Sequence, residues 1–152
     1  MKLLDNHATL DVALRLFQFG TKECWDLVER LRLDLLVAAG RARLDVVSTL
    51  VYSHPGDRGH IDRLAEASES AGALMSFVQL RPPRPVLEAR VVHPSRQGTR
   101  KVRDAAALGR ILDAHDLTTP IHDEDLSIDN SKLAAEAAAA MIASAVGIRP
   151  GV

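Results

Sequence analysis

The chain has 152 residues, of which 47% are hydrophobic and 26% are charged, and this composition fits one globular domain with a buried core. Its formal net charge of −1 argues against a general attraction to nucleic acid, so any anion-binding site has to be local. No secretion signal is present, and no apolar run approaches the roughly 18 residues of a membrane helix, so we expect a cytoplasmic protein without a nucleic-acid or membrane partner.

The first half of the chain alternates between strand-like and helix-like segments. A short apolar start, Lys2 to Leu4, precedes apolar residues at helical spacing that predict a helix from Thr9 to Phe19. A longer amphipathic helix is predicted from Thr21 to Gly40. The β-branched run Asp45 to Tyr52 (DVVSTLVY) is typical of a strand buried on both faces, and a charged helix from Gly56 to Ala71 follows it.

The second half continues the alternation. Met75 to Leu80 predicts another buried strand, and three prolines then lead into a helix that carries Arg90. Asp104 is expected to cap a helix that runs to His115. After a polar loop, Leu126 to Asp129 predicts a short strand, and Leu133 to Val146 an alanine-rich helix. The whole order predicts a single α/β domain over residues 1–152, a three-layer sandwich with a mainly parallel sheet.

A basic segment stands out because it contains no acidic residue. Between Arg90 and Arg103 it carries five cations: Arg90, Arg96, Arg100, Lys101 and Arg103. Such a cluster suits phosphate or carboxylate oxygens, and its arginines would stabilise charge on a transferring phosphoryl group. The alternative is a solvated surface loop; the density of cations favours function modestly.

Polar residues follow each predicted strand, and the carboxyl ends of parallel strands meet at one edge of a sheet. The residues concerned are Asp5, Asn6 and His7 after the first strand, Tyr52, Ser53 and His54 after the second, Arg81 after the third, and Asp129 with Asn130 after the last. For Asp5 two interpretations carry similar weight. Its carboxylate either orients or deprotonates a substrate hydroxyl, or it caps the following helix.

Other groups of residues resemble metal-binding motifs but lack the ligands or the spacing that those motifs require, so we expect no metal site. The run from Asp123 to Asp129 lacks the glycine and the glutamate of a calcium loop. Histidines and aspartates between His115 and Asp123 lack a helical metal-binding spacing, which favours a solvated loop. The only cysteine, Cys24, excludes disulfide frameworks and is interpreted as a packing residue.

Several segments together resemble the small P-loop kinases, the shikimate-kinase-like group of ATP-binding phosphotransferases. They are LLDNH, DVVSTLVY, VQLRPPRPVLEARV, the lid-like HPSRQGTRKVRD of residues 93–103 and Asp104, and LSIDNSKLAAEAAAAMI. The resemblance implies a P-loop NTPase fold, ATP with Mg²⁺ as cofactors, and a small-molecule hydroxyl as phosphate acceptor.

The resemblance also implies roles for single residues. Asp5, Arg96 and Arg100 would be catalytic. Asn6, His7 and Arg90 would bind the acceptor substrate. Arg110, Asp129 and Asn130 would bind the nucleotide, the last two beside the adenine.

One motif of the family is missing. Family members begin with a strand followed by GxxxxGK(S/T), and this sequence contains no such segment. In the family's strand order, 2-3-1-4-5, the missing strand is the central one. Its loss would leave the segments Asp45 to Tyr52 and Met75 to Leu80 without their shared neighbour. We therefore expect an N-terminally incomplete kinase domain that is inactive as written.

Two alternatives remain open beside the kinase. The chain would be a non-catalytic relative that binds an anion or a partner through the basic segment. Otherwise it would be an assembly subunit, an oligomer whose open sheet another chain completes by strand addition.

Overall fold

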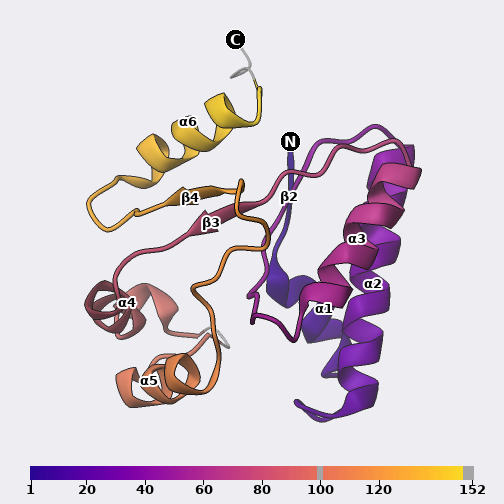
Figure 1. Cartoon of the computed structure of the whole chain (residues 1–152). Coiled ribbons are helices and arrows are strands. Elements are labelled where there is room, and N and C mark those ends of the chain that lie inside the picture. Colours follow the sequence, from indigo (N-terminus) through magenta and orange to yellow (C-terminus); the bar gives the residue numbers. More distant parts are fainter. Residues whose placement is uncertain (99–100, 149–152) are drawn as a thin grey trace. The chain divides into compact units, whose positions relative to one another are not determined.

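The computed structural model describes residues 1–98 and 101–148. Within these residues the chain is an α/β protein with six α-helices and two parallel two-stranded sheets (Figure 1), which confirms the α/β class and the parallel pairing but not the three-layer sandwich. The chain divides into two compact units, which we call the first unit (Met1–Met75) and the second unit (Ser76–Val152). None of the described helices is long and apolar enough to cross a bilayer.

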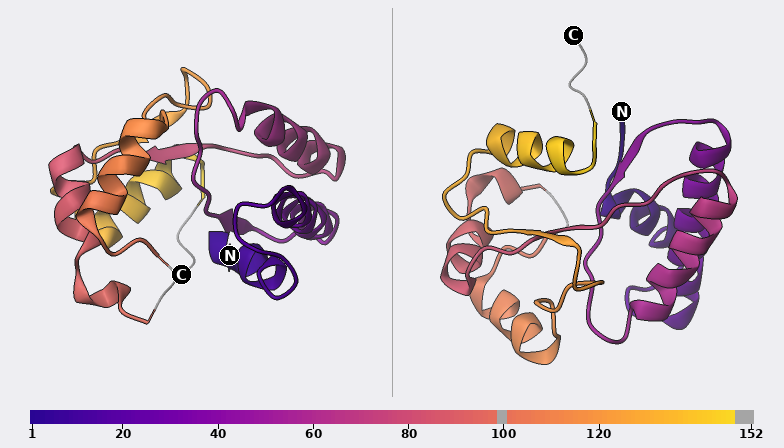
Figure 2. Two further views of the ribbon diagram at one scale, coloured as in Figure 1. Left: turned by 90° about the horizontal axis from the view of Figure 1, so that it is seen from below. Right: turned by 45° about the horizontal axis from the view of Figure 1, so that its top comes forward.

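The first unit pairs two strands and packs three helices. Its elements are β1 (Lys2–Leu4), α1 (Asn6–Ala13), α2 (Lys22–Arg41), β2 (Val46–Ser48) and α3 (Arg58–Ser70). The strands run parallel, with Leu3 opposite Val47. Helix α2 packs along α3 and also against α1 (Figures 1 and 2). The buried apolar side chains lie on these helices and include Leu10, Ala13, Cys24, Val28, Ile61 and Leu64. Cys24 is fully buried there, which confirms its interpretation as a packing residue.

The helix boundaries of this unit follow local signals, with one difference. Thr21, where the sequence predicts this helix to begin, is the N-cap of α2, because its side chain accepts a hydrogen bond from the Cys24 amide at 3.3 Å. Gly20 takes a positive φ of 88° just before this cap. Helix α1, however, spans Asn6–Ala13, so it begins before the predicted Thr9 and ends before the predicted Phe19. Beyond it the chain turns, so that Leu14 and Phe17 pack on the buried cluster from an irregular segment.

Strand β2 differs most from its predicted form. Only Val46–Ser48 of the eight-residue run is strand, and Val47 and Val51 are 40% and 66% exposed. The prediction of a strand buried on both faces was therefore wrong for this structure. The physical reason is that β2 has one described neighbour, the three-residue β1, so the ladder stops where β1 stops.

The second unit has the same two-strand, parallel arrangement. Its elements are β3 (Val78–Leu80), α4 (Arg84–Val91), the 3₁₀ turn η1 (Pro94–Arg96), α5 (Ala105–Ala114), β4 (Leu126–Ile128) and α6 (Ala135–Ala145). Gln79 of β3 lies opposite Ser127 of β4. Helix α6 packs on β4, and α4 packs on α5 (Figure 2). Its fully or nearly buried apolar residues are Val91, Ile128 and Ala138.

Most predicted elements of this unit are present with shorter bounds. Asp104 caps α5 as predicted, and its Oδ1 accepts from the Ala107 amide at 2.6 Å. Strand β3 covers only the last three residues of the predicted Met75 to Leu80. The described strands form two pairs, so the α/β class is shown while the continuous three-layer sandwich stays a prediction.

Candidate functional site

The carboxyl ends of β1 and β2 meet in the first unit, as expected for parallel neighbours. The Asn6 amide donates a 2.9 Å hydrogen bond to Oγ1 of Thr49, and the Thr49 amide donates to the carbonyl of Leu4 at 3.1 Å. The strands thus deliver the residues that follow them to one edge. Asn6, which the sequence predicts as a substrate-binding residue, lies at this edge.

Asp5 occupies the N-cap of α1. Its Oδ1 accepts a 2.8 Å hydrogen bond from the amide of His7, so the capping interpretation is confirmed. Capping uses one carboxylate oxygen, and an ionised carboxylate has about four acceptor positions. The cap and a role in substrate binding are therefore compatible, and the second stays a prediction.

Arg32 of α2 is the functional candidate that sequence reasoning missed. It is only 8% exposed, and its Nη2 donates a 2.6 Å hydrogen bond to Oδ1 of Asn6. Burial lowers the pKa of the guanidinium, while the Glu29 and Asp57 carboxylates raise it. The sequence did contain a signal for its burial, because Arg32 follows the buried Val28 by four residues and so lies on the apolar face of α2.

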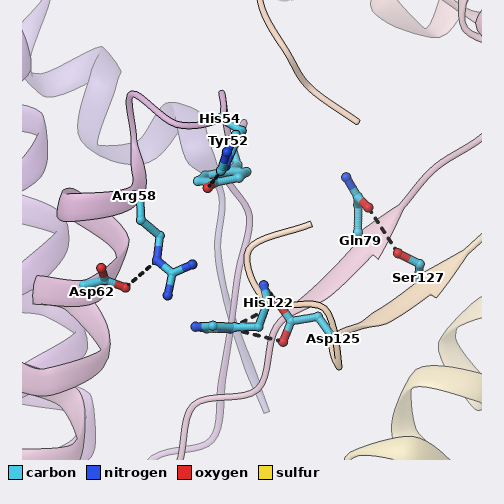
Figure 3. Close-up of polar contacts among 8 residues, drawn as sticks. All are labelled: Tyr52, His54, Arg58, Asp62, Gln79, His122, Asp125 and Ser127. Carbon is cyan, nitrogen blue, oxygen red and sulfur yellow. Dashed lines mark hydrogen bonds and ion pairs between the residues drawn. The ribbon is translucent and has the colours of Figure 1, made fainter. Parts of the chain in front are cut away.

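The segment between β2 and α3 is held in place by hydrogen bonds among its own polar groups. The Tyr52 hydroxyl and Nδ1 of His54 are 3.0 Å apart (Figure 3), and the Ser53 amide donates to Oδ2 of Asp57 at 2.8 Å. Arg58 forms an ion pair with Asp62 one turn further along α3 (Figure 3). This segment leads from β2 into α3 with a defined backbone, which suits a loop that borders a site.

A second cluster of charges lies between α2 and α3. Nδ1 of His60 is 3.3 Å from Oε2 of Glu29, which Arg63 also contacts at 3.1 Å. Burial lowers the pKa of His60 and outweighs the opposite effect of Glu29, while Arg32 and Arg63 lower it further. Glu29, His60 and Arg63 line a groove of about 310 Å³, and none of the predicted site residues lines it.

In the second unit, Arg90 joins the turn after β4. Its Nη2 donates to the backbone carbonyl of Asn130 at 2.7 Å, and its Nη1 lies 3.4 Å from the Asn130 side-chain oxygen. Asp129 accepts from the Ser131 amide at 2.8 Å, and hydrogen bonds from Ser131 lower the pKa of that carboxyl. The structure thus brings together Arg90, Asp129 and Asn130, and Arg90 uses part of its donor set to hold this turn.

The remaining predicted cations are not gathered into one site in the described residues. Arg96 donates to the carbonyl of Val102 at 3.1 Å, which closes the basic segment on itself. His93 caps η1 by accepting from the Ser95 amide. The Arg110 side chain is exposed on α5 and makes no hydrogen bond or ion pair within residues 1–98 and 101–148. Arg100 lies outside the described residues.

The acidic loop before β4 organises itself through hydrogen bonds. Asp116 accepts bonds from the backbone and hydroxyl groups of Thr118 and Thr119, which lower the pKa of its carboxyl. The His122 amide donates to Asp125 at 2.8 Å, and the imidazole contacts the same carboxylate (Figure 3). No group of three or more metal-ligating side chains is placed to hold an ion within the described chain.

The middle residues of β3 and β4, which lie opposite each other, are joined by their side chains. The Ser127 hydroxyl donates to Oε1 of Gln79 at 3.1 Å (Figure 3), and Nε2 of Gln79 donates to the carbonyl of Thr118 at 3.2 Å. These bonds fasten the acidic loop to the sheet. A second groove, of about 490 Å³, lies near α4 and α5, and Arg84 in it is already paired with Glu88 and Asp113.

Comparison of the chain with protein-family models, with curated proteins and with solved structures returned no match.

Proposed function

We propose that this chain is the acceptor-binding and lid part of an ATP-dependent small-molecule phosphotransferase of the P-loop kinase type. The observation that carries the proposal is the pairing of the strands. Removing strand 1 from the order 2-3-1-4-5 leaves the neighbours 2-3 and 4-5. The described strands pair in the same way, β1 with β2 and β3 with β4, and both pairs are parallel.

A mismatch between the sequence and the exposure of β2 supports the same proposal. The run Asp45 to Tyr52 has the nearly continuous apolar character of an interior strand, yet Val47 and Val51 are exposed. Strands with this composition lie inside parallel sheets, paired along both edges and covered by helices on both faces. A further parallel strand beside β2 would pair its second edge, and the crossover helix that accompanies such a strand would cover these valines.

In this proposal Asp5 orients the acceptor hydroxyl and takes up its proton while the phosphoryl group moves. Asn6 and His7 bind the acceptor. The arginines of the basic segment, Arg96 and Arg100, neutralise charge on the transferring group, and Mg²⁺ together with a phosphate loop supplies the rest. Phosphoryl transfer depends almost wholly on such positioning and charge neutralisation, so the 152-residue chain by itself is expected to be inactive.

The test compares two proteins. The first is the 152-residue chain, and the second is the chain extended by the in-frame codons upstream of Met1. We expect the extension to encode GxxxxGK(S/T), and the extended protein to bind MgATP and to transfer its γ-phosphate to a small hydroxyl compound. An extension without this motif, or a folded extended protein that does not bind MgATP, would refute the proposal.

The variant D5N in the extended protein separates the two roles of Asp5. Asparagine caps a helix about as well as aspartate, so the melting temperature should stay unchanged. Asparagine is not a general base, so kcat should fall by about 10²- to 10⁴-fold. An unchanged kcat would leave Asp5 with the capping role alone.

The edge of β2 that has no strand partner in the described part of the chain also favours a second candidate, in which a different chain supplies the missing strand. A stable hetero-oligomer, with the exposed valines protected from hydrogen exchange in the complex, would support this assembly. Size-exclusion chromatography with light scattering on the co-expressed proteins distinguishes it from the extended single chain.

A further inference from the structure

We propose that Asn6 donates a hydrogen bond to an oxygen of the acceptor substrate, and that Arg32 is the positioning residue that orients it. The inference rests on the proposed function in one respect, namely that an acceptor hydroxyl binds at the carboxyl end of β1. Its starting point is the 2.6 Å bond from Nη2 of Arg32 to Oδ1 of Asn6, made by a side chain that is only 8% exposed.

The bond fixes which way the Asn6 carboxamide faces. A guanidinium has five N–H donors and no acceptor, so only the amide oxygen is compatible with a contact of this length. The NH₂ group must then lie on the opposite side of the carboxamide. No hydrogen bond joins Asn6 Nδ2 to any other residue that the structure describes, so its two donors are available to a ligand.

The backbone of Asn6 is fixed as well. Its amide donates to Oγ1 of Thr49, and the preceding residue, Asp5, caps the same helix turn. The main chain of Asn6 is thus held by the residue that follows β2, and its side chain by α2. A donor held in this way loses little conformational entropy when it binds a ligand, which is the usual advantage of a preorganised site.

The energetics of Arg32 also indicate a specific role. Within the described residues its guanidinium forms no ion pair, and the Glu29 and Asp57 carboxylates act on it from a greater distance. A buried charge with a single neutral partner costs stability compared with an apolar side chain of similar volume. In return, a charged donor polarises the amide and strengthens the NH₂ group as a donor, because bonds in a chain reinforce one another.

The two residues at the end of β1 then offer opposite chemistry. The Asp5 carboxylate only accepts hydrogen bonds, and the Asn6 NH₂ only donates them. A hydroxyl satisfies both, since it donates its proton and accepts with its lone pairs. The site therefore fits a small polyhydroxylated acceptor, such as a polyol or a sugar, in which an oxygen next to the phosphorylated hydroxyl accepts from Asn6.

The decisive variant is N6D in the full 152-residue chain. The new carboxylate keeps an oxygen for Arg32 and turns the contact into a buried ion pair, so the melting temperature should be unchanged or higher. Both N–H donors are lost at the same time. The double variant N6D/R32M should lose this stabilisation, and R32K, which keeps a cationic donor, should retain most of the wild-type behaviour.

Binding is measured by NMR without nucleotide, with glycerol, myo-inositol and D-ribose as probes. We expect at least one probe to shift the Asn6 side-chain amide signals, and N6D to weaken its affinity by about tenfold, as for the loss of one hydrogen bond in a partly buried site. Equal affinity in N6D and wild type, or Asn6 signals that no probe shifts, would overturn the inference.

The outcome is independent of the kinase test. If polyols bind through Asn6 but the extended protein transfers no phosphoryl group, the proposed function is refuted and the role of Asn6 in binding is supported. If the extended protein transfers phosphoryl groups but N6D does not change the affinity for the acceptor, the role of Asn6 is refuted and the proposed function is supported.

Discussion

Thr49 and Asn6 are joined across the ends of two strands, because Oγ1 of Thr49 accepts the amide hydrogen of Asn6 at 2.9 Å. This amide belongs to the first turn of α1, whose backbone N–H groups have no partner within the helix. The variant T49V keeps the shape of the side chain and removes this acceptor. We expect the free energy of unfolding of the first unit to fall by about 1 kcal/mol.

Fluorescence of Trp25, the only tryptophan and a residue of α2, reports urea unfolding of that unit. T49S is the matched control, since it keeps the hydroxyl oxygen. A T49V protein as stable as T49S would show that water replaces the bond at no cost.

The α5 cap gives a local prediction in the second unit. D104A removes the carboxylate that accepts from the Ala107 amide and should cost about 1 kcal/mol of helix stability, whereas D104N should cost much less. Hydrogen exchange at Ala107 is the direct measurement. Its rate should rise in D104A and stay near the wild-type value in D104N; equal rates in both variants would contradict the capping role.

Replacing glycine by alanine is expected to have opposite effects on stability at two positions of the first unit. A Cβ at Gly40 of α2 would lie 3.2 Å from the Cβ atoms of both Ala71 and Ala73, which are fixed to the backbone. G40A should therefore destabilise the unit by about 1 kcal/mol despite the better helix propensity of alanine. At Gly59 of α3 the nearest atom is the mobile end of Arg63 at 3.6 Å, so G59A should stabilise it by up to about 1 kcal/mol.

Both variants are followed by the same Trp25 transition, which makes G59A the control for G40A. A stabilising G40A would mean that the contact of α2 with the turn after α3 can widen at no cost.

His60 gives a prediction about pH. Burial lowers its pKa in the folded protein below the ordinary 6.5, so the unfolded state takes up the proton first as the pH falls. The neutral imidazole makes its full contribution to the free energy of unfolding above about pH 6.5. This contribution is lost as the pH falls through the pKa of His60 in the folded state. The groups that face it are Glu29 and Arg32 of α2, Arg63 of α3, and Asp57.

H60Q removes this titration, so the stability of the first unit should fall less steeply between pH 7 and pH 5 than in the wild type. H115Q, which changes a histidine of the second unit, is the control and should leave the slope of the first unit unchanged. Identical slopes in H60Q and wild type would assign the pH dependence to other groups.

Local signals in the sequence were sufficient for the caps. Asp104 was predicted as a cap and Thr21 as the start of α2 because a side-chain oxygen before a helical pattern meets unpaired amides only a few residues away. The order of strands and helices followed from periodicity for the same reason: the interactions concerned span one or two turns.

Long-range relationships were not accessible in this way. The apolar run after Asp45 predicts what kind of surroundings a strand prefers, but the length of its ladder depends on β1, more than forty residues away. The bond from Arg32 to Asn6 spans 26 residues, and that from Arg90 to Asn130 spans 40. Such pairs are fixed by tertiary packing, and a single sequence does not encode them as a pattern.

The half-paired strand β2 has a consequence for how the chain behaves when it is made alone. Within the described residues the edge of β2 away from β1 has no strand partner, so it presents backbone donors and acceptors near the exposed Val47 and Val51, and such an edge is a template for pairing with other molecules. Concentrated solutions of the 152-residue chain should therefore form intermolecular β-structure that binds thioflavin. The variant V47K, which places a charge at this edge, should slow the growth of that β-structure.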